Sequence, residues 1–138
     1  EIIDKKILSW IREVEERGAG EIILTDISRE GTGSGIDIDT ILCLVNNVKI
    51  PVIYHGGFGK KEDILEVLKI ENIDGICLSS ILHYSVLKNA DAYKINKKEK
   101  IGNTQFLENQ INFGSFETIS LYNLKKFLLE NSINTRLK

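Results

Sequence analysis

The sequence has no methionine, a single proline and only two cysteines among its 138 residues. Because translation begins with methionine, we expect the chain to have been trimmed or cut from a longer polypeptide. Cys43 and Cys77 lie in apolar runs without the spacing of metal ligands, which indicates small buried thiols of a reducing compartment. The sequence therefore favours a cytoplasmic protein with no disulfide framework and no metal site.

Long apolar runs and an excess of one charge are also lacking. No stretch approaches the ~18 apolar residues of a membrane span, and residues 1–4 do not resemble a signal peptide. The net charge of -2 and the pI near 5.8 argue against general binding to nucleic acid or to anionic membranes. With 42% hydrophobic residues, the chain is expected to fold around a core.

Short apolar strands alternate with amphipathic helices along most of the chain. The predicted strands are Glu21–Thr25, Pro51–Tyr54 and Gly75–Leu78. The predicted helices are Ile2–Arg17, Asp39–Asn47, Lys60–Ile70, a short one that begins at Ser79–Ser80, and Leu121–Glu130. This order favours a parallel sheet covered by helices, either a doubly wound sheet or part of a (βα) barrel. Because a closed barrel takes eight strands and about 250 residues, three strands indicate a partial one.

The first and last predicted helices each carry a stripe of apolar residues. In the first, the apolar positions at helical spacing are Ile3, Ile7, Trp10, Ile11 and Val14. In the last, Leu121, Leu124, Phe127 and Leu128 share one side. We therefore treat residues 1–138 as one partial domain, interrupted by an irregular insertion near 90–117. The lysine-rich run Lys94–Lys100 within this insertion is interpreted as a solvated loop.

Each predicted strand is followed by a polar or glycine-rich loop, and in a barrel these loops share one rim. The loops are Gly31–Gly35, His55–Gly59 and Ser79–Ser80. A phosphate needs several converging backbone N–H donors, and glycine lets the backbone approach it closely. Each loop alone is equally well explained as a tight turn. The three together predict a phosphate site.

Four carboxylates and two histidines lie at or near the same rim. Asp26, Glu30, Asp37 and Asp39 are candidates for proton transfer, and Asp39 is expected to serve instead as a helix N-cap. His55 is open to three roles: general acid, phosphate donor or packed rim histidine. For His83 we favour a partly buried structural role.

Five motifs resemble the family of the cyclase subunit of imidazole glycerol phosphate synthase. In chain order they are Gly18–Thr25, Arg29–Gly35, His55–Lys60, Ser80–Tyr84 and Ser132–Arg136. The resemblance covers most of the chain apart from residues near 90–117. It implies a (βα)8 TIM barrel, of which this chain would form the C-terminal half, about strands 6–8 with their helices.

The resemblance also implies an activity. Family members take ammonia from a glutaminase subunit and convert a bis-phosphorylated ribulosyl aminoimidazole carboxamide substrate, without a cofactor, to imidazole glycerol phosphate and an aminoimidazole carboxamide ribotide. By motif matching, Gly31, Gly57 and Ser80 would bind one substrate phosphate, with Thr25 and Ser79 close by. Glu30 matches an acidic residue thought to act in acid–base chemistry.

Two departures from the family pattern leave an alternative open. Glu30 stands where the family usually has aspartate, and His55 replaces a small serine beside the phosphate. With the insertion near 90–117, these changes resemble a paralogue from surface-glycan gene clusters, which channels ammonia from a glutaminase to a sugar amidotransferase. The loop Thr25–Arg29 also resembles the sister isomerase of histidine biosynthesis.

Overall fold

The computed structural model describes residues 5–88 and 114–137, and there the predicted alternation of helices and strands is confirmed. The elements in chain order are α1 (Lys5–Glu16), β1 (Ile22–Thr25), α2 (Ile38–Val45), β2 (Val52–His55), α3 (Lys61–Leu68), β3 (Ile73–Cys77), α4 (Ser80–Lys88) and α6 (Leu121–Glu130). The last helix has the predicted bounds, and the others differ from prediction by a few residues at their ends.

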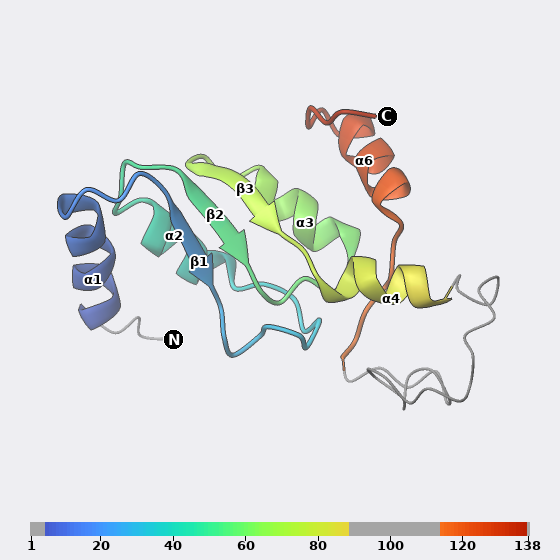
Figure 1. The fold of residues 1–138 in the computed structure, drawn as a ribbon, viewed down its shortest axis with the longest axis horizontal. Helices are drawn as coiled ribbons and strands as arrows, with labels where there is room; N and C mark the ends of the chain where they lie inside the picture. The colour runs from blue at the N-terminus through green and yellow to red at the C-terminus, as the bar shows by residue number, and fades with distance from the viewer. Residues whose placement is uncertain (1–4, 89–113, 138) are drawn as a thin grey trace.

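The three strands form one parallel sheet in the order β1-β2-β3. Thr25 is paired with His55, and His55 with Cys77, so the last residues of the strands stand in one row. All three arrows in Figure 1 point toward the same edge of the sheet. The loops that follow the strands are therefore brought together there, as the alternation of strands and helices predicts.

The core lies between the sheet and the helices that cover one of its faces. Val52 and Tyr54 alternate along β2 and are almost completely buried, as are Ile41 of α2 and Ile64 of α3. Figure 1 shows both helices behind the strands. Ile23 of β1 points to the opposite face, where 61% of its surface is exposed. The sheet therefore has one well-packed face and one more open face.

The apolar stripe of α1 is only partly buried. Ile11 is buried, whereas Ile7 is 47% and Trp10 is 61% exposed. The segment after α2 contacts this helix, where the backbone N–H of Lys49 donates a hydrogen bond to Glu15 at 2.9 Å. The neighbouring described residues therefore cover only part of the apolar stripe of α1. Ile3 lies outside the described residues.

Two further expectations need correction. The N-cap of α2 is Asp37 rather than Asp39, because Asp37 has extended backbone angles and accepts a hydrogen bond from the N–H of Thr40 at 3.1 Å. Asp39 lies within the first helical turn. Cys43 and Cys77 are free but only partly buried.

In α6, Leu124 and Leu128 are buried as predicted, but Leu121 is 53% exposed because it lies at the first turn, beyond the contact with the core. Most of the insertion predicted near 90–117, with Lys94–Lys100, falls outside the described residues. No helix in the described part of the chain is both long and apolar enough to cross a membrane.

Candidate functional site

A pocket lies at the edge where the three strands end. It has about 50 Å³ of open space, and a single water needs about 10–15 Å³ measured in this way. The lining residues come from all three strand-end loops and from the segment before α6: Glu30, Gly31, Gly33, His55, Gly56, Gly57, Phe58, Cys77, Ser79, Ser80, Ile81 and Phe116. The pocket therefore has room for one small group such as a phosphate.

The structure brings most of the predicted site residues to this pocket. Six of the seven line it: Glu30, Gly31, His55, Gly57, Ser79 and Ser80. Thr25 is not among the lining residues, since it belongs to β1 itself and not to the loop that follows this strand. Its hydroxyl oxygen is 3.5 Å from His55 Nδ1, so it contacts a lining side chain instead.

Gly57 holds two of the loops together at close range. Its φ is +82°, and a Cβ at this position would collide with the carbonyl oxygen of Gly35. The N–H of Gly35 donates to the carbonyl of Gly57 at 2.9 Å. Glycine is required at position 57 both for the positive φ and for this backbone approach. The pocket wall is thus formed by main chain, which can offer N–H groups to an anion.

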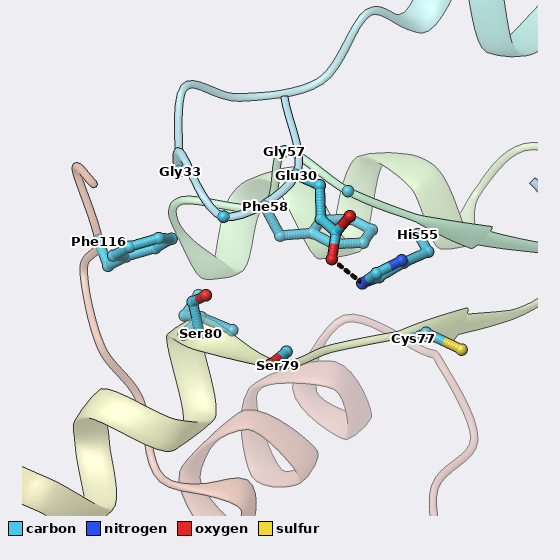
Figure 2. Close-up of a pocket in the computed structure, with 12 residues that line it drawn as sticks. Glu30, Gly33, His55, Gly57, Phe58, Cys77, Ser79, Ser80 and Phe116 are labelled. Atoms are coloured by element: carbon cyan, nitrogen blue, oxygen red, sulfur yellow. Dashed lines mark ion pairs between the residues drawn. The ribbon is translucent and has the colours of Figure 1, made fainter. Parts of the chain in front are cut away.

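Glu30 and His55 face one another at one end of the pocket. Figure 2 shows the carboxylate of Glu30 directed at the His55 ring, and Glu30 Oε1 lies 4.0 Å from His55 Nε2. The Glu30 side chain is 52% exposed and the His55 side chain 23%. The contact of Thr25 with Nδ1 orients the ring so that Nε2 faces Glu30. The two groups are placed to exchange a proton with a ligand bound beside them.

Ser80 is the first residue of α4 and contributes a hydroxyl group to the pocket. The backbone N–H groups of Leu82 and His83 are bonded to the carbonyl of Ser79, at 3.1 and 2.9 Å, which begins the helix there. The N-terminal end of a helix carries a partial positive charge. With the glycine loops opposite, this end favours an anion in the pocket.

The other acidic candidates have structural partners. Asp26 Oδ1 accepts hydrogen bonds from the N–H of Ser28 at 3.0 Å and its hydroxyl at 2.6 Å, and Oδ2 lies 3.4 Å from Arg29 Nε. Asp37 caps α2. Glu30 is therefore the carboxylate of the described rim that lines the pocket.

The structure revises the prediction for His83. We expected a partly buried residue, but His83 is exposed, because on α4 it lies on the side opposite the buried Ile81 and Ser85. Its ring contacts that of Tyr84 edge to face, with centroids 5.5 Å apart.

Two pocket residues were missed by the sequence reasoning. Cys77 stands beside His55 in the sheet register, and aligning the strand ends would have found it. Phe116 comes from the segment before α6, within the predicted insertion, and no local pattern connects it with the strand-end loops. Only the path of the chain brings it there.

The chemistry of the described site is that of anion binding beside an acid–base pair. Within residues 5–88 and 114–137, no three His, Cys, Asp or Glu side chains gather in a way that would hold a metal ion. Main-chain glycines, a serine hydroxyl and a helix N-terminus form the anion-binding part. Glu30 and His55 form the part that can move protons.

Comparison with known proteins places the chain in a family. Residues 2–88 match the family described as "Histidine biosynthesis protein". The chain is 40% identical over 96 residues to the imidazole glycerol phosphate synthase subunit HisF of Methanococcus vannielii, which covers 70% of this chain and 34% of that protein. It is 39% identical over 94 residues to HisF of Pyrobaculum aerophilum, covering 68% and 37%. With HisF of Prochlorococcus marinus it shares 41% identity over 97 residues, covering 69% and 38%.

The chain thus spans little more than a third of the length of the curated relatives it matches. The family match itself extends over more than half of this chain, from α1 to the end of α4, and it includes all three strands and their loops. The chain belongs to the histidine biosynthesis protein family.

Proposed function

We propose that the complete protein is the cyclase subunit of imidazole glycerol phosphate synthase. It would use ammonia from a glutaminase partner to convert the bis-phosphorylated ribulosyl aminoimidazole carboxamide substrate to imidazole glycerol phosphate and an aminoimidazole carboxamide ribotide. The family membership and the names of the relatives support this proposal.

The observation that carries the proposal is the convergence of three loops on one pocket. Gly31, Gly57 and Ser80 come from successive βα connections, and all three line a space of phosphate size. A substrate phosphate there would meet backbone N–H groups, the Ser80 hydroxyl and the positive end of α4. We assign this pocket to one of the two substrate phosphates, with Ser79 beside it and Thr25 supporting His55.

Glu30 is the proposed proton-transfer residue. Its carboxylate lines the pocket and faces His55, and its half-exposed position leaves it able to reach a bound substrate. The longer glutamate side chain places the carboxylate one methylene farther from the main chain than an aspartate would. His55, which lies beside Glu30, would contact the phosphate or the reacting part of the substrate from the same end of the pocket.

The remaining part of the proposal concerns the barrel. Here β1 and β3 are the edge strands of an open sheet, and the chain covers little more than a third of its relatives. We propose that the three strands are about strands 6–8 of a (βα)8 barrel whose other strands pair with these edges. The first part of such a barrel would supply the second phosphate site, so this chain alone is expected to be inactive.

The direct experiment supplies the complete protein with ammonium and the ribulosyl substrate and follows both products by chromatography. Formation of imidazole glycerol phosphate together with the ribotide would support the proposal. No turnover at high ammonium, with a folded protein, would contradict it. The glutaminase is tested by whether its addition lets glutamine replace ammonium.

A binding experiment tests the phosphate site separately. We expect the variant Ser80→Ala to bind inorganic phosphate about tenfold more weakly, because a hydrogen bond to a charged group is lost. Ser9→Ala on α1 is the matched control, since Ser9 is exposed and bonded to the carbonyl of Lys6. Equal affinity of Ser80→Ala and the unchanged protein would place the phosphate elsewhere.

The ammonia-conduit alternative gains no support from the comparisons, because the matched relatives are named imidazole glycerol phosphate synthase subunit HisF. It would be favoured by a protein that binds phosphate and a glutaminase yet shows no turnover with ammonium.

A further inference from the structure

The segment before α6 is hydrogen-bonded to two of the pocket loops and to α4. The backbone N–H of Ser115 donates to the carbonyl of Thr32 at 2.8 Å, and that of Glu117 donates to Gly59 at 2.7 Å. The N–H of Ile119 donates to Ile81 at 3.4 Å. Alternate residues of one extended segment are thus bonded to the first loop, the second loop and α4 in turn. We call residues 115–119 the strap.

Phe116 lies within the strap, and its ring packs closely against neighbouring residues. A Cβ at Gly33 would lie 2.7 Å from Phe116 Cδ1, and a Cβ at Gly114 would lie 2.6 Å from Cζ. The ring of Tyr84 lies 5.6 Å away between centroids, tilted by 31°. Two glycines therefore leave the space that the phenyl ring fills, and a tyrosine supports it from α4.

The ring forms the apolar end of a pocket whose other end is charged. Figure 2 shows Phe116 beside Ser80 and Gly33, with Glu30 and His55 on the far side of the pocket. The pocket is open to solvent on one side, so a phosphate bound in it can carry a carbon skeleton that extends out of it. The skeleton of a phosphate ester must leave the pocket past one of these walls.

A phenyl face beside a phosphate site offers a specific contact. The C–H groups of a sugar or polyol chain pack against an aromatic face, while inorganic phosphate has no such groups. A ring that is already held in place makes this contact with little loss of conformational entropy, because its position is fixed before the ligand binds.

We propose that Phe116 is a specificity-determining residue that makes the pocket prefer sugar or polyol phosphate esters over inorganic phosphate. This inference rests on the proposed phosphate site. It adds a residue outside the three strand-end loops to that site, and it gives the strap the task of holding the ring in place.

The test compares two probes, inorganic phosphate and ribose 5-phosphate, by calorimetric titration of the complete protein. The variants are Phe116→Ala and Phe116→Leu, where leucine retains much of the apolar volume without the ring. Tyr122→Ala is the matched control, because Tyr122 is an aromatic residue of α6 with 62% exposure.

We expect both Phe116 variants to bind ribose 5-phosphate about tenfold more weakly, with the affinity for inorganic phosphate changed less than about twofold. The control should change neither affinity. A parallel loss of both affinities in Phe116→Leu would overturn the inference, because the ring would then act only by holding the loops.

The remaining outcomes separate this inference from the proposed function. If the unchanged protein binds both probes equally well, the phosphate site stands and the role of Phe116 is wrong. If it binds neither probe, the phosphate site fails and the role of Phe116 fails with it.

Discussion

His55 Nε2 lies 4.0 Å from Glu30 Oε1, and the two side chains approach from different loops at the mouth of one pocket. Thr25, the last residue of β1, contacts the other ring nitrogen of His55. Thr25 and His55 therefore end neighbouring strands, and Glu30, from the loop after β1, contacts Nε2 of His55. Since Glu30 is half-exposed, its contact with His55 adds little to the stability of the fold. Its proposed importance is proton transfer with a bound ligand.

The first prediction concerns this carboxylate. Replacing Glu30 by Gln should lower turnover of the complete protein by about 10²–10⁴-fold, the usual contribution of a general acid or base. The free energy of unfolding should change by less than about 0.5 kcal/mol, as for most surface substitutions. Steady-state kinetics and urea unfolding measure the two effects.

The matched control is Glu62→Gln, on the exposed surface of α3 and 3.9 Å from Lys61. It should leave turnover unchanged. If Glu30→Gln retained full activity, Glu30 would have no part in proton transfer.

The second prediction concerns the backbone contact at Gly57. Gly57→Ala should destabilise the fold by about 3 kcal/mol or more, because it combines a strained φ with a collision against Gly35. Gly31→Ala is the control: its φ is +71°, but a Cβ there meets nothing within 4 Å. It should cost about 1–2 kcal/mol from backbone strain alone. Urea unfolding measures both, and equal losses would show that the Gly57–Gly35 approach adjusts freely.

The third prediction concerns Tyr54, whose hydroxyl is buried without a hydrogen-bond partner among the described residues. Tyr54→Phe should keep or raise the free energy of unfolding, because a buried polar group without a partner costs about 1–3 kcal/mol. The phenyl ring would keep the edge-to-face contact with Phe58, at 5.6 Å between centroids. Tyr54→Ala should instead cost about 3–5 kcal/mol through the cavity it leaves.

Tyr54 also predicts how the stability of the fold changes at alkaline pH. Burial raises the pKa of Tyr54 from 10.0 to about 12. The folded state therefore holds the proton more tightly than the unfolded state, and stability should fall as the pH rises from 10 to 12. Tyr54→Phe should remove this part of the decline. A decline of equal size in the variant would assign it to other groups.

The fourth prediction concerns the cap of α2. The backbone N–H of Thr40 and then its hydroxyl donate to Asp37, and these bonds hold the pKa of that carboxyl below its ordinary value of 3.8. Since the folded state favours the charged form, the added stability is present above pH 3.8 and is lost as the pH falls through the lower folded pKa.

Asp37→Ala should therefore cost about 1 kcal/mol at neutral pH and flatten the acid side of the stability profile. Asp39 lies in the first turn of α2 but does not make the capping bonds, so Asp39→Ala should lower the free energy of unfolding by only a few tenths of a kcal/mol. Unfolding by urea at pH 7 and at pH 3 measures the difference. A larger loss from Asp39→Ala would restore Asp39 as the cap.

The elements of this fold could be predicted because their information is local. Leu121–Glu130 has the predicted bounds, and β1 and β2 each lie within a residue of prediction, since a buried strand or an amphipathic helix repeats its apolar residues at short, fixed spacing. The order of those elements, with the glycine-rich loops after the strands, also indicated which residues would meet at the strand ends.

Helix ends and partial burial were less well predicted. Both Asp37 and Asp39 precede the apolar residues of α2, and the backbone direction at residue 37 makes that residue the cap. Trp10 fits the apolar spacing of α1 and yet is mostly exposed, because exposure depends on which surface stands opposite the helix.

By itself, the sequence determined the α/β order, the parallel strands and the loops that carry Glu30, Gly31, Gly57 and Ser80. Only the tertiary structure decided that Thr25 contacts Nδ1 of His55 and that Cys77 lies next to His55 in the sheet. It also decided that Phe116 lines the pocket. The physical reason is distance along the chain. Periodicity reports contacts between near neighbours, whereas Phe116 meets Gly33 through the path of the whole backbone, and no local pattern records that path.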